Sequence, residues 1–302
     1  MNSLNPQDSH SRTNAFLQIH FAVILFGFTA ILGRLITLPG PTVVFFRILL
    51  TLLSLAIATG VVKKIGSVSK RELWRLSGIG LLVSLHWITF FWAIKLSNVT
   101  ITLTCLGTSS FTTALLEPMI LRTRMKWYEA ALGVLVFAGV YIIFRFNSDD
   151  TIGIIVALLS ATFSALFGVL NKKMVERQDP LMITFVELGS GWILVAALMP
   201  VFYFWFPDEP FVPLPMDWVY LSILAFLCTS IAYVIALRAL KVLTPFVVAL
   251  SVNLEPVYGI LMAFAIFSEH RDLDSWFFAG TGLILLSVLL HPLLEMKYGR
   301  KM

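Results

Sequence analysis

The chain has 302 residues, of which 58% are hydrophobic and 13% are charged, and its formal net charge is +5. So few charged side chains cannot cover the surface of a water-soluble globule of this length. The composition therefore argues against a soluble enzyme and predicts a protein whose solvent is the lipid bilayer.

Ten apolar stretches follow one another along the chain, and most are close to the ~20 residues that cross a hydrocarbon core. They run approximately over Ala15–Ile36, Pro41–Val62, Leu73–Leu96, Val99–Leu121, Trp127–Phe144, Ile152–Val169, Pro180–Phe206, Trp218–Leu237, Thr244–Phe267 and Ser275–Leu293. The polar connections between them are too short to fold alone. We therefore predict an all-α membrane protein with one ten-helix domain at 15–293, a cytoplasmic N-terminal segment at 1–14 and a cytoplasmic tail at 294–302.

The distribution of lysine and arginine predicts the orientation. Most of the 22 lie on the side that holds both ends of the chain: Arg12, Lys63, Lys64, Lys70, Arg71, Arg75, Arg122, Arg124, Lys126, Lys172, Lys173, Arg177, Arg238, Lys241, Lys297, Arg300 and Lys301. Acidic residues such as Asp208, Glu209 and Asp274 gather on the other side. By the positive-inside rule, both termini face the cytoplasm in a multi-pass protein of the cytoplasmic (inner) membrane. The cations alternate with membrane spans, so we expect no nucleic-acid partner.

Internal similarity divides the ten spans into two halves, at 15–145 and 152–293. Ala93-Ile94-Lys95 precedes Ser110 by the same distance at which Ala239-Leu240-Lys241 precedes Pro256. Pro41 precedes Phe46-Arg47 much as Pro180 precedes Val186-Glu187. Chance similarity between leucine-rich helices is the alternative, which several matches in the same order weaken. Because each half holds an odd number of spans, the second half must be inverted relative to the first, as in many secondary transporters.

Several short motifs together resemble the EamA family of the drug/metabolite transporter superfamily. They are Phe26-Gly27, Phe46-Arg47, Ala93-Ile94-Lys95, Leu254-Glu255-Pro256-Val257 and Phe267-Ser268-Glu269. The chain departs from the family where a glycine-glutamate pair usually follows the fourth span, since Arg122-Thr123-Arg124 stands there. The resemblance implies a basket of ten helices around a central cavity that moves a small metabolite by alternating access.

Three ionisable residues lie at membrane depth, where a charge is costly unless it faces water or a partner. Arg47 in the second span is expected to line the cavity, either to bind a carboxylate or phosphate of the substrate or to pair structurally. Glu187 and Glu255 are candidates for proton coupling, because a carboxyl group in a dry site could bind a proton and release it when the site hydrates. The alternative is a protonated glutamate that bonds a neighbouring helix. We expect Glu117, near the end of the fourth span, to pair with Arg122 or Arg124.

Aromatic residues and a histidine complete the candidate substrate site. Trp87, Trp92 and the repeat-related Tyr233 could stack on an apolar substrate or hold an ammonium group. His86 could titrate near physiological pH. For each of these residues, packing or interfacial anchoring is the alternative. The predicted substrate-binding residues are therefore Arg47, His86, Trp87, Trp92, Tyr233 and Glu255.

The sequence thus predicts a carrier that exports small metabolites, such as amino acids or related amphipathic compounds. Protons are the candidate coupling ion, and membrane lipid is the surrounding partner. The sequence has no phosphate-binding glycine-rich loop and no metal-ligand cluster, so we expect no cofactor and no ATP hydrolysis. An intramembrane lipid-modifying enzyme with Glu255 and His86 as an acid/base pair, and a non-transporting scaffold, are the alternatives.

Overall fold

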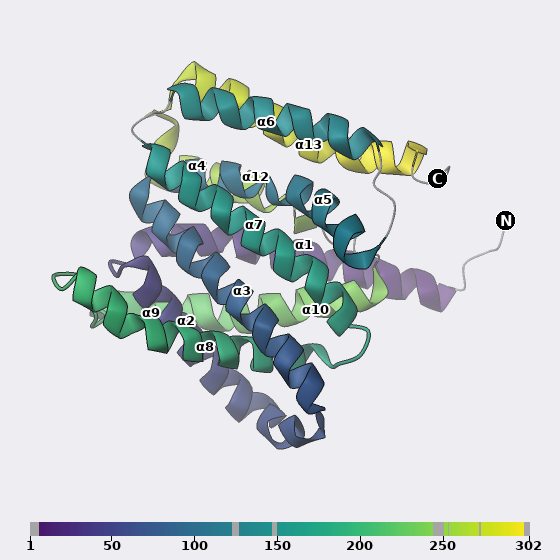
Figure 1. The fold of residues 1–302 in the computed structure, drawn as a ribbon, viewed down its shortest axis with the longest axis vertical. Helices are drawn as coiled ribbons and strands as arrows, with labels where there is room; N and C mark the ends of the chain where they lie inside the picture. The colour runs from purple at the N-terminus through teal and green to yellow at the C-terminus, as the bar shows by residue number, and fades with distance from the viewer. Residues whose placement is uncertain are drawn as a thin grey trace.

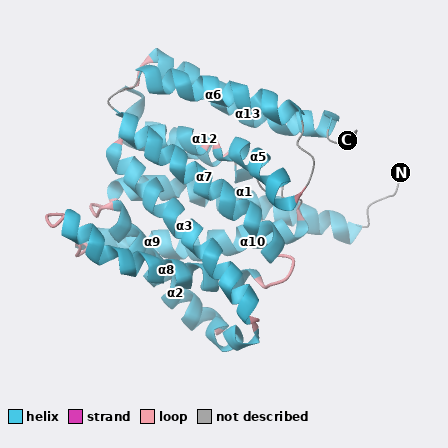
Figure 2. Cartoon of the chain, viewed as in Figure 1, coloured by secondary structure: helices cyan, strands magenta, loops and turns pink. Residues whose placement is uncertain are grey.

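The computed structural model describes residues 6–122, 127–146, 150–243, 251–252, 254–271 and 273–298. Across these residues the secondary structure consists of helices joined by short loops, without a strand (Figure 2). The first half contains α1 (Pro6–Leu35), α2 (Gly40–Thr59), η1 (Val61–Ser67), α3 (Lys70–Leu96), α4 (Val99–Leu106), α5 (Ser109–Leu121) and α6 (Trp127–Phe146). The second contains α7 (Thr151–Met174), α8 (Pro180–Trp205), α9 (Pro215–Ala225), η3 (Phe226–Ile231), α10 (Ala232–Val242), α12 (Glu255–Phe267), η4 (Glu269–Arg271) and α13 (Ser275–Tyr298).

Local sequence signals set several helix starts. The side chain of Ser69 accepts a hydrogen bond from the backbone N–H of Glu72 at the start of α3, and Asn98 accepts one from Ile101 at the start of α4. Pro180 and Pro215 occupy the first turns of α8 and α9, where a missing N–H costs nothing. These caps bind donors that the helix itself leaves unpaired, so the helices begin close to the predicted positions.

The predicted spans coincide with helices, with two local differences. Seven helical segments are long and apolar enough to cross a membrane, and Ala131–Ile143, Glu255–Phe267 and Ser275–Ser287 are apolar but shorter. The predicted fourth span is broken into α4 and α5 at Gly107 and Thr108, and the eighth contains the π-helical turn η3. Part of the predicted ninth span, residues 244–250 and 253, lies outside the described residues. The structure is therefore that of a multi-pass membrane protein, while the number of ten spans stays a prediction.

Helix contacts repeat between the two halves. Helix α3 of the first half packs on α7 of the second, and its counterpart α10 of the second half packs on α1 of the first. In the same way α4 and α5 pack on α7, and α12 packs on α1. The fifth helices of the halves, α6 and α13, pack on each other. Backbone positions Gly139 and Gly280 meet there, and the rings of Trp127 and Tyr298 are 5.5 Å apart. The start of α6 thus contacts the end of α13, so these two helices are antiparallel and the halves are inverted.

The inverted arrangement gives the molecule two opposite sides. The described chain begins at Pro6 and ends at Tyr298 on the same side, at the right of Figure 1. We call this the terminal side. The connections from α1 to α2, from α3 to α4 and from α8 to α9 lie on the opposite side, which we call the far side.

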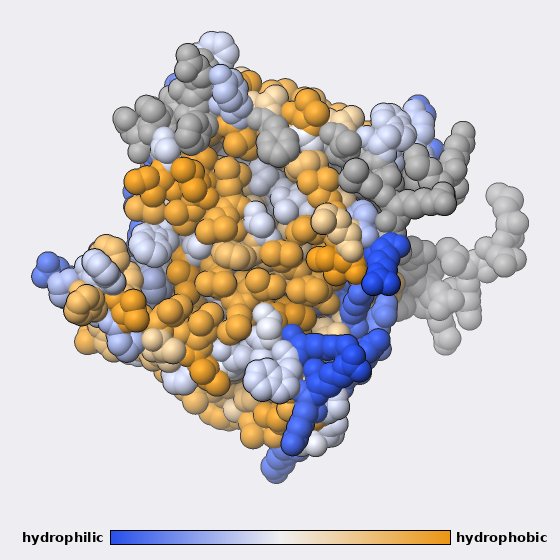
Figure 3. Space-filling view, viewed as in Figure 1, coloured by the Kyte–Doolittle hydropathy of each residue, from blue (hydrophilic) through white to orange (hydrophobic). Residues whose placement is uncertain are grey.

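Between these sides the surface is apolar. Large hydrophobic side chains are exposed along the helices, including Val134 at 70%, Ile193 at 66% and Leu53 at 50%. Figure 3 shows a broad hydrophobic band, with hydrophilic residues concentrated toward the terminal side. Exposed apolar surface of this extent is typical of contact with lipid, where it costs nothing.

Close helix packing depends on particular glycines, which yields a first prediction. A Cβ atom at Gly80 of α3 would lie 2.1 Å from the backbone oxygen of Glu187 in α8, whereas one at Gly78 would meet nothing within 4 Å. We expect Gly80→Ala to destabilise the purified protein by about 1–3 kcal/mol, the usual cost of overpacking, because a backbone atom must move. Gly78→Ala should leave the thermal unfolding temperature in detergent unchanged. Equal unfolding temperatures for the two variants would contradict this account of the α3–α8 contact.

Candidate functional site

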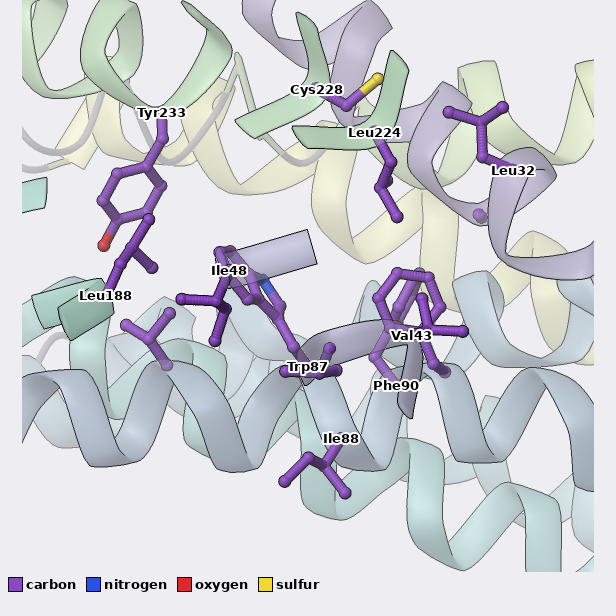
Figure 4. Packing of buried hydrophobic residues seen from close by; sticks show 14 of the residues in the cluster. Leu32, Val43, Ile48, Trp87, Ile88, Phe90, Leu188, Leu224, Cys228 and Tyr233 are labelled. Carbon is purple, nitrogen blue, oxygen red and sulfur yellow. The ribbon is translucent and has the colours of Figure 1, made fainter. Parts of the chain in front are cut away.

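A cavity of about 230 Å³ lies between the two halves. Its walls come from α1, α2, α3, α4, α5, α7, η3, α10 and α12, and among the described residues none of the lining belongs to α6, α8 or α13. Five of the predicted substrate-binding residues line it: Arg47, His86, Trp87, Tyr233 and Glu255. Figure 4 shows Trp87 and Phe90 pointing from α3 toward the segment that carries Cys228 and Leu224. Helix α3 turns Ile88 in the opposite direction.

Arg47 is the charged centre of this cavity, and its side chain is fixed in place. Its Nε donates to Thr229 Oγ1 at 2.7 Å and its Nη2 to the backbone oxygen of Cys228 at 3.5 Å. The guanidinium carbon lies 3.8 Å from the centre of the Trp87 ring, a cation–π contact. The remaining nitrogen, Nη1, has no hydrogen-bond partner among the described residues. One edge of the buried guanidinium fork therefore has donors without a partner, and their geometry suits an anionic group.

The π-helical turn η3 supplies both acceptors for Arg47. Thr229 Oγ1 donates to the backbone oxygen of Leu224 at 2.8 Å, and Ser230 Oγ donates to that of Ala225 at 3.0 Å. These side chains bond carbonyls five residues back, where the wide turn leaves them without their usual helical partner. A π-helical turn of this kind often marks a functional site, because it frees backbone carbonyls inside a helix.

Glu255 and Pro256 form part of the wall on α12. Glu255 lines the cavity at the start of α12 and attracts Arg47 electrostatically. Pro256 is buried in the first helical turn and lies near Gly107, at the break between α4 and α5. The cavity thus presents a cation and a carboxyl group in an otherwise mostly apolar enclosure.

Glu187 lies behind the cavity wall rather than in it. Its side chain is fully buried, and Oε2 accepts hydrogen bonds from the Tyr233 hydroxyl at 2.7 Å and from Asn171 Nδ2 at 3.3 Å. Tyr233 and Asn171 both line the cavity. The two predicted proton-coupling residues therefore occupy different places, with Glu255 facing the cavity and Glu187 one side chain away from it.

His86 is held by Ser160 of α7. Nδ1 lies 3.0 Å from the Ser160 backbone oxygen and 2.9 Å from its Oγ, while that Oγ donates to the His86 backbone oxygen at 3.0 Å. Since the single hydroxyl hydrogen is used in this way, Nδ1 must carry a hydrogen and donate it. A neutral ring then keeps Nε2 as its acceptor. The imidazole is thus oriented by its contacts between two helices.

Trp92 is the one predicted substrate-binding residue that the structure does not place at the cavity. Its ring packs instead near Phe202 and Phe206, with centroids 6.2 and 6.1 Å away. Five residues along an α-helix rotate a side chain by about 140°, so Trp92 faces another direction than Trp87. The aromatic side chain of Trp92 and its depth in the membrane do not indicate in which direction the ring points.

The cavity extends toward the terminal side. Glu117 of α5 and Lys172 of α7 line it there and form an ion pair, with side chains 32% and 27% exposed. Glu117 was expected to pair with Arg122 or Arg124. The structure gives Lys172 as its partner because α5 packs along α7, and Arg124 lies outside the described residues.

The far side is held by two buried acids. Asp217 accepts hydrogen bonds from the Thr37 backbone N–H at 2.8 Å and from the Thr37 hydroxyl at 2.7 Å. Glu269 accepts from the Thr100 backbone N–H at 2.9 Å and from Val99 at 3.3 Å, at the start of α4. Asp217, in the first turn of α9, therefore ties the second half to the connection between α1 and α2, and Glu269, in η4, ties it to the start of α4.

Comparison with known proteins gives the family. The model of the EamA-like transporter family matches residues 14–145 and 151–291, nearly the whole chain in two repeats. The chain belongs to the EamA-like transporter family. This family is part of the drug/metabolite transporter superfamily. The match and the structure's inverted halves agree on the division into two repeats.

Two proteins are similar to this chain over most of its length. An uncharacterized transporter, YxxF of Bacillus subtilis (strain 168), is 24% identical over 293 residues, which cover 92% of this chain and 91% of that protein. A protein of known crystal structure is similar in fold, with a TM-score of 0.63 at 16% identity, covering 94% of this chain and 98% of the other. The comparisons therefore point to a membrane transporter rather than an enzyme.

Some residues of the candidate site were not predicted from the sequence. Thr229 and Cys228 hold Arg47 from the π-helical turn η3, a local geometry that their residue types do not indicate. Asn171 had a detectable signal, since an amide near the end of an apolar span needs a partner. In the predicted fourth span, Thr104, Thr108 and Thr112 each donate to a backbone carbonyl three or four residues earlier, whereas Ser109 and Thr113 line the cavity.

Proposed function

We propose that the protein is a secondary transporter that exports small metabolites with an anionic group and an apolar or aromatic part. Its mechanism is alternating access of the central cavity to the two sides of the cytoplasmic membrane. The free Nη1 of Arg47, inside an aromatic-walled cavity between inverted halves, is the observation that carries this proposal.

The chemistry of the cavity supports such a substrate. Nη1 and the guanidinium plane suit a carboxylate or phosphate oxygen. Trp87, Phe90 and Phe167 provide aromatic surface nearby. Glu255 could hold an ammonium group, which an amino acid or related amphipathic compound would supply. The volume of about 230 Å³ lies below the ~300–1,000 Å³ usual for drug-sized ligands, so a small metabolite fits best.

The orientation of the cavity supports export. By the positive-inside rule the terminal side is cytoplasmic, and the cavity extends toward that side at Glu117 and Lys172. The contacts of Asp217 and Glu269 hold the far side together. In this conformation a substrate would enter from the cytoplasm. Release on the far side then requires those contacts to open.

A ligand screen followed by flux measurements tests the proposal. The purified protein is screened by thermal shift against amino acids, nucleosides and cationic drugs, since a ligand that prefers the folded state raises its apparent stability. We expect small amphipathic compounds with a carboxylate to raise the unfolding temperature and to cross proteoliposome membranes. Absence of both a shift and flux across the panel would reject the transporter. A lipid-modification assay on the same preparation would then test the alternative of an intramembrane enzyme.

A further inference from the structure

The buried carboxyl group of Glu187 has an incomplete set of partners. Its Oε2 accepts from Tyr233 and Asn171, but its Oε1 has no hydrogen-bond partner among the described residues. The Oδ1 of Asn171 also lacks one. A glutamate and an asparagine that already contact each other thus each leave one oxygen unsatisfied, in a region without access to solvent.

No cationic side chain pairs with this carboxyl among the described residues. Arg47 of α2 bonds Thr229 and Cys228, Lys172 of α7 bonds Glu117, and His86 of α3 bonds Ser160. From α10 the titratable group that bonds the carboxyl of Glu187 is the Tyr233 hydroxyl, whereas the contact with Gly80 of α3 is made by the backbone of Glu187. Lys63 of η1 is exposed, and among the described residues it makes no recorded contact with this carboxyl group.

A proton on Glu187 accounts for two features of this cluster, the missing cationic partner and the two oxygens without a hydrogen-bond partner. An unpaired carboxylate in the membrane interior is costly by several kcal/mol, and protonation removes the charge. The same proton gives Oε1 a hydrogen to donate, beside an amide whose oxygen needs a donor. Tyr233 and Asn171 line the cavity, so they separate Glu187 from the space that water and substrate would enter.

We propose that Glu187, Tyr233 and Asn171 form a proton-binding site that is separate from the anion-binding edge of Arg47. The two sites occupy related places in the two repeats. Arg47 follows Pro41 in α2 and stacks on Trp87 of the next helix, and Glu187 follows Pro180 in α8 and bonds Tyr233 of the following segment. The repeats thus hold a cation in one half and a proton-binding acid in the other.

The position of Glu187 also links its proton to helix packing. It lies on α8 where that helix packs tightly on α3, through Gly80 and Gly191. An ionised Glu187 would need water or a cation, and either requires α8 to separate from Tyr233 or Asn171. Loss of the proton is therefore coupled to movement of α8 relative to α7 and α10, within the second repeat. This coupling rests on the proposed transport function, whereas the proton site itself does not.

Infrared difference spectroscopy tests the proton site without any substrate. In lipid at neutral pH, the wild-type protein should show the C=O stretch of a buried carboxylic acid, sensitive to exchange into D₂O or to raised pH. Glu187→Gln should remove this band. Glu255→Gln, which alters the other membrane-depth carboxyl of the cavity, should retain it. Tyr233→Phe should shift the band, because the hydroxyl donor to Oε2 is lost.

Two results would overturn the proton site. The first is a band that persists unchanged in Glu187→Gln together with a Tyr233→Phe spectrum like that of the wild type. The second is a band that disappears when sodium replaces choline at constant pH, which would mean that a metal cation occupies the site. Tyr233→Phe keeps the test decisive should Glu187→Gln lower the unfolding temperature.

Proteoliposome measurements then separate this inference from the proposed function. They use the compound with the largest flux in the ligand panel. Glu187→Gln should lose accumulation driven by a pH gradient, down to the level without a gradient, and retain exchange of labelled for unlabelled compound. Wild-type flux that does not respond to the pH gradient would reject the coupling but leave the proposed transport function in place. A Glu187 infrared band without flux of any panel compound would keep the proton site and reject transport.

Discussion

Arg47→Ala is expected to abolish binding and transport of anionic substrates, while the protein stays folded. Removing one partner of a buried ion pair usually costs about 3–5 kcal/mol, because the other charge is left unpaired in a poorly solvated place. That loss corresponds to a decrease in affinity of roughly two to four orders of magnitude. The wall around the arginine should remain, since Trp87 and Phe91 pack within the hydrophobic core.

Two variants show whether the guanidinium itself is required. Arg47→Lys keeps the charge but loses the planar fork that reaches Thr229 and a ligand together, so we expect partial loss. Arg75→Ala removes an exposed arginine from α3 and should leave binding unchanged. Thermal shift with the best panel compound and flux in proteoliposomes are the measurements. Arg47→Ala with wild-type flux would show that Arg47 has a structural role.

The fold was largely predictable because the bilayer restricts the possible structures. A chain segment in hydrocarbon must satisfy its own backbone, so apolar stretches of sufficient length become helices. The inverted repeat followed from an odd number of spans in each half and is visible in the antiparallel pair of α6 and α13. The break at Gly107 and the π-helical turn were not predictable, because they depend on contacts between helices.

Residues of the candidate site were predictable from the sequence where their charge requires a polar environment. They were not predictable where their position depends on which side of the helix faces the cavity. The cost of a charge in hydrocarbon correctly directed Arg47 and Glu255 to the cavity. The same argument could not distinguish Glu255, in the wall, from Glu187, behind it. Trp92 shows the limit of an argument from residue type, since its ring packs on Phe202 and Phe206 instead. The direction in which a side chain points depends on the rotation of its helix about the helix axis, and the packing of the bundle determines that rotation.

Closure of the far side has a specific physical basis, which yields the second large effect. Asp217 bonds Thr37 in the connection from α1 to α2, and Glu269 bonds the first backbone N–H groups of α4. A carboxylate near a helix N-terminus is also stabilised by the helix dipole. Hydrogen bonds to charged groups contribute about 1.5–3 kcal/mol each, so the two acids together favour the closed far side strongly.

The double variant Asp217→Asn, Glu269→Gln is therefore expected to shift the protein toward a far-side-open state by at least about tenfold in population. A cysteine at Thr29, which lines the cavity on α1, reports this shift when Cys105 and Cys228 are replaced by serine. Membrane-impermeant maleimide should label it slowly in intact cells and faster in the double variant. In inside-out vesicles the reporter should react readily without either substitution, because the cavity extends to the terminal side.

A matched control decides whether the buried contacts or the far-side charges keep this side closed. Glu209→Gln removes an exposed acid from the connection between α8 and α9, and it should leave labelling in intact cells at the slow rate. Labelling that accelerates equally in the control would assign the effect to net charge on the far side. An unchanged rate in the double variant would mean that Asp217 and Glu269 stabilise their connections without controlling access. The predicted difference arises because both acids join one repeat to the other, so the cavity cannot open to the far side until those bonds break.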